Sequence, residues 1–448
     1  MAEETVGQVS EAALVAWVRQ AAPYIHAFRG RTFVIAFGGE VLGTDKAQAL
    51  AQDFNLLASL GIRLVLVHGA RPQIDAEMQR RGLPLRFHKG LRVTDGDALE
   101  CVKSAMGVTR IEIEALLSQG LPNTPMAGAW MRVTGGNFIT AKPVGVLDGI
   151  DHLYTGAVRK IIAEEIKADL DQQNVVLITP LGVSPSGEIF NLAWEEVAEA
   201  VAVALQADKL IFLSAAPGVV DKKGQLLEAV TVDEVESLLA RRVKQAPELE
   251  RVLVEAVRAC RAGVGRVHFL DRNADGAMLM EFFTRAGVGT VMTRSALVSL
   301  REATVDDVGA ILALIAPLEA DGTLVKRGRE RIEMEVGRFS LLEDDGVIVG
   351  CAALYPFSGA KKQEQAGELA CLAVMAEYRR CGYGDQLRKH IEARAKKLKL
   401  KKLFVLTTRT AHWFIERGFV ESDVTALPEA KRELYNYQRR SKVFIKGL

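Results

Sequence analysis

The chain has 448 residues, of which 49% are hydrophobic and 25% are charged. This composition excludes disordered, collagen-like and fibrous proteins, and the length is too great for one hydrophobic core, so we expect two or three globular domains. The net charge of +1 gives no reason to expect a nucleic-acid partner.

The charge is unevenly distributed along the chain. From residue 296 onward there are 26 Lys and Arg against 21 Asp and Glu, whereas the preceding part has 31 against 35. A basic C-terminal part favours an anionic ligand in that half of the protein.

Cysteine usage and the lack of apolar runs indicate the compartment. The five cysteines are scattered and form no Cys-x-x-Cys pair, which is typical of reduced thiols in a cytosolic protein, and we predict no metal site. The N-terminal residues have neither the basic region nor the apolar core of a signal peptide, and no apolar run reaches membrane-spanning length. We therefore expect a cytoplasmic protein without membrane contact.

The first predicted element is a helix over residues 10–28. Ser10 is a suitable N-cap, and an apolar stripe recurs at helical spacing. Pro23 should kink this helix. The stripe consists of Leu14, Val18, Ala21, Ile25 and Phe28.

Strands and helices alternate from Thr32 onward. Apolar strands are predicted for TFVIAFGG, IRLVLVHG, VVLITPLG, KLIFLSA and RVHFL, with helices between them. Continuous runs of Val, Ile and Leu between helices predict an open, mostly parallel sheet that is covered by helices on both faces.

Three glycine-bearing loops follow these strands, at residues 37–40, 68–73 and 179–182, where open α/β sheets bind ligands. Together with residues 191–221 they resemble the amino-acid kinase family, in particular N-acetylglutamate kinase, over residues 30–292. The family's lysine before the Gly-Gly pair is replaced here by Ala36. Since phosphoryl transfer depends on positioned charge, we predict a kinase fold that has lost its kinase activity.

The same resemblance implies a regulatory site. Arginine-sensitive members of that family have a similar N-terminal helix and bind L-arginine in the C-terminal part of the fold. A carboxylate suits a guanidinium, and a cation suits an α-carboxylate. The matching positions are Tyr24, Lys209, His268, Glu281, Gly287 and Thr290.

A new pattern begins near Leu297, after a junction at residues 287–300. A strand at residues 297–304 is followed by a helix capped by Thr304, and residues 344–346 form a hairpin turn. We therefore predict a first domain over residues 1–295 and a smaller α+β domain over residues 296–448.

The most informative motif of the second domain runs from Gly367 to Lys397, where an apolar strand leads into a basic, glycine-containing turn and a helix. Glycines let the backbone approach a pyrophosphate, and a splayed strand can pair with the amide chain of coenzyme A. The motif resembles that of GNAT N-acetyltransferases, which implies acetyl-CoA as co-substrate and no tightly bound cofactor. The predicted cofactor contacts are Leu372, Val374, Arg379, Arg380, Gly382 and Gly384.

Acetyl transfer to an amine needs a general base. Glu368 stands at the start of the cofactor strand and is the predicted base. Trp413 and Phe414 stand where the family often has a tyrosine acid, so Thr407 or a water is predicted to protonate the leaving thiolate. A covalent mechanism through Cys371 is disfavoured because this cysteine lies in an apolar strand.

Segments at residues 324–336 and 435–444 supply carboxylate-binding side chains, namely Lys326, Arg331, Arg439 and Ser441. Together with CAALYPF and KLFVLTTRTAHWF, these segments resemble the bacterial N-acetylglutamate synthases over nearly the whole chain. The resemblance implies transfer of acetyl from acetyl-CoA to L-glutamate, the first step of arginine biosynthesis, inhibition by L-arginine, and a homo-oligomer, with a hexamer expected.

Two other functions stay open at this point. In the first, the chain is an active N-acetylglutamate kinase with a regulatory acetyltransferase-like module. In the second, it is an arginine sensor without catalytic activity. Ala36 argues against the first, and the cofactor motif argues against the second.

Overall fold

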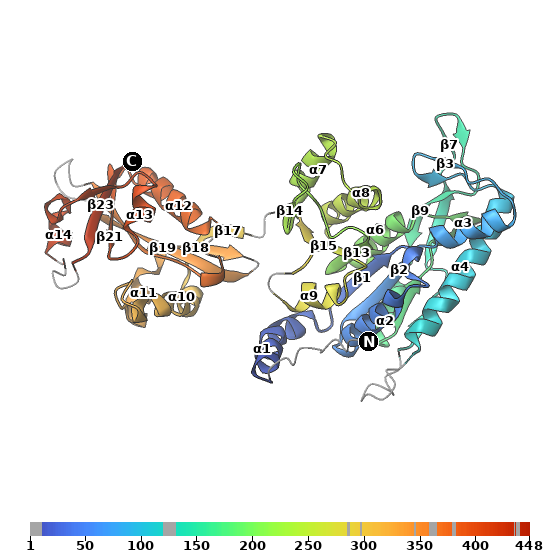
Figure 1. The fold of residues 1–448 in the computed structure, drawn as a ribbon, viewed down its shortest axis with the longest axis horizontal. Coiled ribbons are helices and arrows are strands. Elements are labelled where there is room, and N and C mark those ends of the chain that lie inside the picture. Colours follow the sequence, from blue (N-terminus) through green and yellow to red (C-terminus); the bar gives the residue numbers. More distant parts are fainter. Residues whose placement is uncertain are drawn as a thin grey trace, which may run out of the picture. The chain divides into compact units, whose positions relative to one another are not determined.

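The computed structural model of the chain describes residues 11–119, 131–284, 287–295, 298–344, 346–357, 365–378, 382–433, 435 and 440–448. It divides into two compact units, residues 1–295 and residues 296–448 (Figure 1). Each unit has its own sheets and its own hydrophobic clusters.

The first unit begins with α1 (Glu11–Phe28). Its C-terminal half packs against a hydrophobic cluster of the unit through Tyr24 and Phe28. The predicted apolar stripe also included Leu14 and Val18, but these side chains are 57% and 50% exposed. Within the described chain, only the second half of the stripe is therefore buried.

The central sheet of the first unit has the strand order β14-β16-β15-β13-β1-β2-β10-β5. All neighbouring pairs are parallel except β15–β16, which confirms the predicted open, mostly parallel sheet. The strands are β1 (Thr32–Phe37), β2 (Arg63–His68), β5 (Val133–Thr134), β10 (Val175–Ile178), β13 (Lys209–Ser214), β14 (Ala229–Thr231), β15 (Arg266–Asp271) and β16 (Thr290–Thr293).

Helices cover both faces of this sheet, and alternate residues of β1 face opposite ways. Phe33 and Ile35 belong to the cluster with α2 and α9, whereas Val34 and Ala36 belong to the cluster with α6 and α8. Burial on both sides explains why these strands are continuous apolar runs. The helices are α2 (Asp45–Ser59), α3 (Arg71–Arg80), α4 (Gly96–Leu117), α5 (Ala163–Asp171), α6 (Trp194–Leu205), α7 (Val232–Ala240), α8 (Pro247–Arg261) and α9 (Ala277–Phe283).

The sequence analysis assigned no elements to residues 84–174, where the structure has α4, α5, two hairpins and two strands of a second sheet. The second sheet has the order β12-β11-β6-β9. Its strands are β6 (Ile139–Pro143), β9 (Gly156–Ile161), β11 (Leu181–Val183) and β12 (Ile189–Asn191). The hairpins pair β3 (Phe87–His88) with β4 (Leu91–Arg92), and β7 (Val146–Leu147) with β8 (Ile150–Asp151).

The second unit is built on one sheet with the order β17-β18-β19-β20-β21-β23-β22. Its neighbouring strands are antiparallel except for β20–β21. The strands are β17 (Val298–Glu302), β18 (Phe339–Asp344), β19 (Val347–Phe357), β20 (Ala366–Val374), β21 (Lys402–Thr407), β22 (Val420–Ser422) and β23 (Lys442–Gly447).

Helices lie on both faces of this sheet as well (Figure 1). α10 packs on one face of β19 through Ile311 and Ile315, and α12 packs on the other through Leu387 and Ile391. Thr304 forms the predicted cap, as part of a capping box before α10. The helices are α10 (Val308–Ala320), α11 (Arg329–Glu335), α12 (Tyr383–Lys397), α13 (Ala411–Ile415) and α14 (Glu429–Arg432).

We predict that Gly367→Ala destabilises the second unit by about 1–3 kcal/mol, because a core that is already filled resists an added methyl group. A Cβ at Gly367 would lie 2.9 Å from side-chain atoms of Leu354 and Leu400 and 3.0 Å from Leu403. Gly337→Ala is the matched control, since nothing lies within 4 Å of its added Cβ. Urea unfolding measures both variants, and equal midpoints would show that β20 tolerates the extra carbon.

Candidate functional site

The parallel pairing between β20 and β21 ends at Glu368. Ala366–Glu368 pairs with Lys402–Phe404, whereas β20 continues to Val374. Beyond Glu368 the described residues of the two strands form no ladder, which confirms the predicted splay. One edge of β20 is therefore open to an extended, amide-bearing chain.

The backbone of β20 directs polar groups to this open edge. Cys371 has φ +52°, and the register against β19 shifts beside it, which marks a bulge. Met375 donates its N–H to the carbonyl oxygen of Val349 on β19 (2.9 Å). Because successive residues of a strand alternate in direction, the N–H of Val374 points to the opposite, open edge. Leu372 is half-buried in the same segment.

The start of α12 lies beside this edge. Gly382 has φ +76°, a conformation that favours glycine, and it begins the helix without a side-chain cap. A Cβ on Gly384 would lie 3.3 Å from the ring of Trp413 and 3.9 Å from Val374. The uncapped N–H groups of this helix are suited to an anion next to the open strand.

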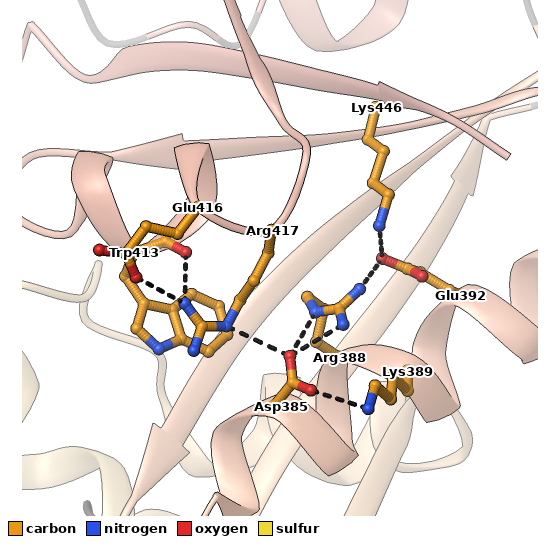
Figure 2. Close-up of polar contacts among 8 residues, drawn as sticks. All are labelled: Asp385, Arg388, Lys389, Glu392, Trp413, Glu416, Arg417 and Lys446. Carbon is orange, nitrogen blue, oxygen red and sulfur yellow. Dashed lines mark hydrogen bonds and ion pairs between the residues drawn. The ribbon is translucent and has the colours of Figure 1, made fainter.

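Ion pairs surround the first turn of α12 (Figure 2). Asp385 contacts the cationic groups of Arg388 (2.8 Å), Lys389 (3.0 Å) and Arg417 (3.2 Å). Burial raises the pKa of Asp385, but the hydrogen bonds from Arg388 and Lys389 outweigh burial and lower the pKa below its usual value. Because three cations face this carboxylate, its charge is compensated and does not repel an anion at the start of the helix.

The same network fixes the neighbouring elements (Figure 2). Arg388 also pairs with Glu392, to which Lys446 of β23 donates (2.8 Å). The guanidinium of Arg417 lies 4.2 Å from the ring of Trp413 and donates to the Trp413 carbonyl oxygen (3.0 Å). α13 and β23 are therefore held against α12, and the indole is kept beside the glycine turn.

The predicted base, Glu368, is buried at the last paired position of β20. It is 7% exposed, and its neighbours across the sheet are Tyr355 and Phe404. Its Oε2 lies 2.7 Å from Nζ of Lys431 on α14. A buried carboxylate needs such a partner, and Lys431 supplies it.

Sequence reasoning missed a half-buried arginine near this carboxylate. Arg327 has its Cζ 5.9 Å from the ring of Tyr355, and its Nε is buried with no hydrogen-bond partner in the described part of the chain. Burial lowers the pKa of Arg327, but the acidic groups around it, Glu368 and Glu335 among them, outweigh burial and raise it. A fixed guanidinium with an unused N–H is suited to a carboxylate ligand.

The two residues on the same segment that were predicted to bind carboxylates are exposed. Lys326 is exposed, and Arg331 is 58% exposed in its side chain and pairs with Glu335 (3.5 Å). The run from Lys326 to Arg331 contains four cationic residues, and no pattern in it tells which one is directed inward.

Thr407 and Ser441 lie at the same end of the β21–β23 ladder. Thr407 is opposite Lys442, which follows Ser441, and both predicted residues are buried. The Thr407 hydroxyl accepts the N–H of Thr410 (3.0 Å) and lies 2.8 Å from the Thr410 hydroxyl. It therefore stabilises the turn into α13, and its role as general acid stays a prediction.

Three predicted residues lie outside the described part of the chain: Arg379 and Arg380 of the glycine turn, and Arg439 before β23. Their assignment stays a prediction.

The thiol of Cys371 lies in the bulge of β20. Burial raises its pKa to about 11, so it stays protonated near neutral pH. A protonated thiol argues against an acetyl-cysteine intermediate, which the apolar strand around Cys371 also disfavours.

In the first unit, three of the residues predicted to bind arginine form a chain. Lys209 Nζ lies 3.1 Å from His268 Nε2, and His268 Nδ1 lies 2.7 Å from Glu281 Oε1. Burial, together with the charge of Lys209, lowers the pKa of His268 to about 4, so the ring is neutral at pH 7 and donates to the carboxylate. Burial opposes ionisation of Glu281, but this hydrogen bond outweighs it and lowers the pKa to about 2.

The other three residues that were predicted to bind L-arginine lie around this chain in different ways. Gly287 is so close that an added Cβ would lie 2.6 Å from Glu281 Oε2. Tyr24 packs on Phe28, whose ring lies 5.0 Å from Lys209 Nζ. Thr290 uses its hydroxyl structurally, since it donates to Leu227 O (2.6 Å) and accepts from Val219 N (2.9 Å). These contacts belong to α1, β13, β15, α9 and β16.

The glycine loop after β1 carries carboxylates instead of a lysine. Ala36 is buried in a hydrophobic cluster. Glu40 Oε2 lies against Gly38, and Glu248 Oε1 lies 3.6 Å from the position of a Cβ there. Glu248 is held by Arg272 (2.7 Å). Negative charge at this loop disfavours a nucleotide phosphate.

Across the described ranges, no helix is both long enough and apolar enough to cross a bilayer.

Two family profiles match the chain. The amino acid kinase family matches residues 31–271, and the acetyltransferase (GNAT) family matches residues 315–419. Among curated proteins, the amino-acid acetyltransferase of Azotobacter vinelandii is 52% identical over 434 residues, covering 97% of this chain and 99% of that protein. The amino-acid acetyltransferase of Ralstonia nicotianae is 50% identical, with 97% and 95% covered.

Solved structures of one relative match over nearly the whole chain. N-acetylglutamate synthase from Neisseria gonorrhoeae, complexed with coenzyme A and L-arginine, is 40% identical with a TM-score of 0.88, covering 97% of this chain and 99% of that one. The same protein complexed with coenzyme A and N-acetyl-glutamate has a TM-score of 0.62 at the same identity and coverage.

We predict that Arg327→Lys raises the Michaelis constant for an amino-acid acceptor roughly tenfold, because the planar fork is lost although the charge is kept. Arg329→Lys is the matched control on the same segment and should change this constant less than twofold, since Arg329 is 69% exposed in its side chain and pairs with Glu333. Steady-state kinetics with both substrates gives the comparison. A larger effect for Arg329 than for Arg327 would reverse the assignment.

Proposed function

The chain belongs to the family of amino-acid acetyltransferases, and from that premise we propose that it converts acetyl-CoA and L-glutamate to N-acetyl-L-glutamate and coenzyme A. The amine nitrogen forms a bond to the thioester carbonyl carbon and the carbon–sulfur bond breaks. The amine loses a proton to a base, and the thiolate gains one. This is the activity that the names of the relatives describe.

The observation that carries the proposal is the open edge of β20 next to the uncapped start of α12. Coenzyme A combines an amide-bearing chain with a pyrophosphate, so one ligand satisfies both features. The compensated charge of Asp385 supports the anion at the helix start. Gly382 and Gly384, with Arg379 and Arg380, are the proposed pyrophosphate contacts.

Glu368 is the proposed general base. It lies where the strands part, so a thioester bound along Leu372 and Val374 has its carbonyl near this carboxylate. Lys431 pairs with this carboxylate (2.7 Å), which is proposed to accept the proton of the amine. The N–H of Val374, which faces the open edge six residues further along β20, is suited to an amide group of the cofactor chain.

The leaving thiolate needs a proton from another group. Thr407, buried at the end of β21, or a water is proposed for this step. The hydroxyl contact between Thr407 and Thr410 gives a route for relaying the proton.

Arginine side chains are proposed to bind the carboxylates of glutamate. Arg327 is the strongest candidate on geometry because of its buried Nε. Ser441 is buried near the end of β21, and Arg439 is two residues before it. Lys326 and Arg331 stay proposed contacts that would have to turn inward on binding.

L-arginine is proposed to inhibit through the chain formed by Lys209, His268 and Glu281. The carboxylate suits a guanidinium and the ammonium suits an α-carboxylate. Inhibition requires two states of unequal affinity.

Assembly and location complete the proposal. We expect a homo-oligomer, with a hexamer as the specific expectation, and the exposed stripe of α1 at Leu14 and Val18 supports a helix contact between copies. Buried free thiols such as Cys101 and Cys260 support a cytoplasmic location.

A kinase activity is not favoured, because Ala36 is buried and Glu40 lies against Gly38.

Release of free thiol from acetyl-CoA across a panel of amino acids, with and without ATP, tests the proposed reaction. L-Glutamate should give the highest rate, and ATP should have no effect. Thiol release with another amino acid as the preferred acceptor, or a rate that needs ATP, would contradict the proposal.

We predict that Glu368→Gln lowers turnover roughly a hundredfold at neutral pH while acetyl-CoA binding changes little, because the amide cannot accept the proton. Glu421→Gln is the control, since Glu421 is an exposed partner of Lys442 in the same unit. Turnover numbers and the dissociation constant of acetyl-CoA are measured for each. Wild-type turnover in Glu368→Gln across the pH range would make this carboxylate structural.

We predict that Glu281→Gln raises the L-arginine concentration for half-inhibition roughly tenfold, since a charge-assisted contact to the guanidinium is lost. Glu236→Gln, which removes a surface pair with Arg261, is the control. Inhibition curves are read relative to each variant's own uninhibited rate. If both variants kept the wild-type curve, arginine would bind elsewhere.

A further inference from the structure

Three arginines in and beside α11 have their guanidinium groups around two side chains, Tyr355 and Glu335. Cζ of Arg327 lies 5.9 Å from the centre of the Tyr355 ring, and Cζ of Arg338 lies 4.9 Å from it. Both distances are within the roughly 6 Å at which an aromatic face attracts a cation. Nε of Arg331 lies 3.5 Å from Oε1 of Glu335.

Tyr355 and Glu335 are bonded to each other. The phenol donates to Oε2 of Glu335 (2.6 Å). Burial, and then this hydrogen bond, raise the pKa of Tyr355, so its hydroxyl stays protonated and remains a donor near neutral pH. Because Arg331 lies at Oε1, both oxygens of Glu335 have a partner.

Tyr355 also lies beside the proposed general base. It pairs with Glu368 on the antiparallel strands β19 and β20, and both side chains are buried. Directly opposite residues of an antiparallel pair project from the same face of a sheet. Tyr355 thus has the proposed carboxylate ligand, Arg327, next to its ring and the proposed base across the strand pair.

An amino-acid acceptor fixes the distance between these two groups. Its amine and its α-carboxylate are attached to one carbon, so the guanidinium and the base must be held at a matching separation. The backbone N–H of Arg327 donates to Oε1 of Glu319 on α10 (2.8 Å), which anchors the main chain. Its Nε has no hydrogen-bond partner among the described residues, so the orientation of the guanidinium depends on the ring of Tyr355.

Glu335 would compete with the substrate if one of its oxygens were free. It is one of the acidic groups whose charge acts on Arg327. A free carboxylate beside a guanidinium tends to form a bidentate pair with it. The bond from Tyr355 therefore keeps Arg327 available for an incoming carboxylate.

We propose that Tyr355 and Glu335 form a positioning pair for the amino-acid acceptor, a role that rests on the acetyltransferase function proposed above. The ring of Tyr355 holds Arg327 beside Glu368. Its hydroxyl keeps Glu335 from pairing with Arg327 in place of the carboxylate of the substrate. Neither member of the pair takes part in the chemical step, so its loss should weaken acceptor binding and leave turnover at saturation unchanged.

Tyr355→Phe tests the hydroxyl while it keeps the ring. We expect the Michaelis constant for L-glutamate to rise roughly fivefold, as for the loss of one hydrogen bond. The turnover number and the Michaelis constant for acetyl-CoA should each change by less than about twofold. Thiol release by the full-length protein measures all three. In an Arg327→Lys background, Tyr355→Phe should add less than about twofold, because it acts through that guanidinium.

A second substitution separates positioning from repacking of the core. Glu335→Gln has no charge with which to pair with Arg327, so adding it to Tyr355→Phe should return the L-glutamate constant to within about twofold of the wild type. If Tyr355 only packed the core, the double variant would be at least as impaired as Tyr355→Phe. Glu333→Gln removes an exposed carboxylate of the same helix that pairs with Arg329, and this control should match the wild type.

Failure of the positioning pair and failure of the proposed reaction give different results. A wild type that releases no thiol with L-glutamate but does so with another amino acid contradicts the proposed reaction, and the variants are then compared with that amino acid. No thiol release with any amino acid would overturn both. With an active wild type, an unchanged acceptor constant in Tyr355→Phe, a loss of turnover instead, or no rescue by Glu335→Gln would overturn the positioning role.

Discussion

The divergence of β20 from β21 after Glu368 is the constraint on which the second unit depends. Parallel pairing holds the two strands through Glu368, and the bulge at Cys371 then leaves the N–H of Val374 without a strand partner on the open side. Exposed strand edges are normally protected, so an edge kept open inside a sheet indicates a ligand that pairs with it. The uncapped start of α12 lies beside Val374, and Glu368, the proposed base, lies at the point of divergence.

Ion pairs then determine which charged side chains act on a bound ligand. Asp385 is compensated by three cations, and Glu368 is paired with Lys431, so neither carboxylate opposes the ligand next to it. In the first unit, by contrast, charged side chains disfavour a ligand. Glu40 lies against the glycine loop that would hold a phosphate in a kinase, and Glu248 beside it is paired with Arg272. A kinase fold can thus be retained while its charges disfavour the original ligand.

The sequence predicted the parallel sheet of the first unit and the splayed strand of the second unit, because each rests on a local pattern: apolar runs, and a strand-to-helix glycine turn. The role of Glu368 as general base stays a prediction. It did not predict the elements of residues 84–174. The hairpin strands β3, β4, β7 and β8 have two residues each and leave too short a pattern, whereas α4, with Asp95 as its N-cap and buried residues along its 22 residues, was missed although it has a helical pattern. It chose Lys326 and Arg331 over Arg327 because a run of cations does not reveal which side chain is directed inward. The apolar stripe of α1 was right in its spacing, but Leu14 and Val18 are exposed in the described chain.

Hydrogen exchange at the amide of Val374 tests the open edge most directly. Mass spectrometry at residue resolution compares the full-length protein with and without acetyl-CoA, and Val405, which pairs with Phe444 in β21–β23, serves as an amide that is protected in both cases. The account predicts fast exchange at Val374 in the free protein and protection of at least tenfold when acetyl-CoA binds. Slow exchange in the free protein, or a rate that acetyl-CoA does not change, would contradict it.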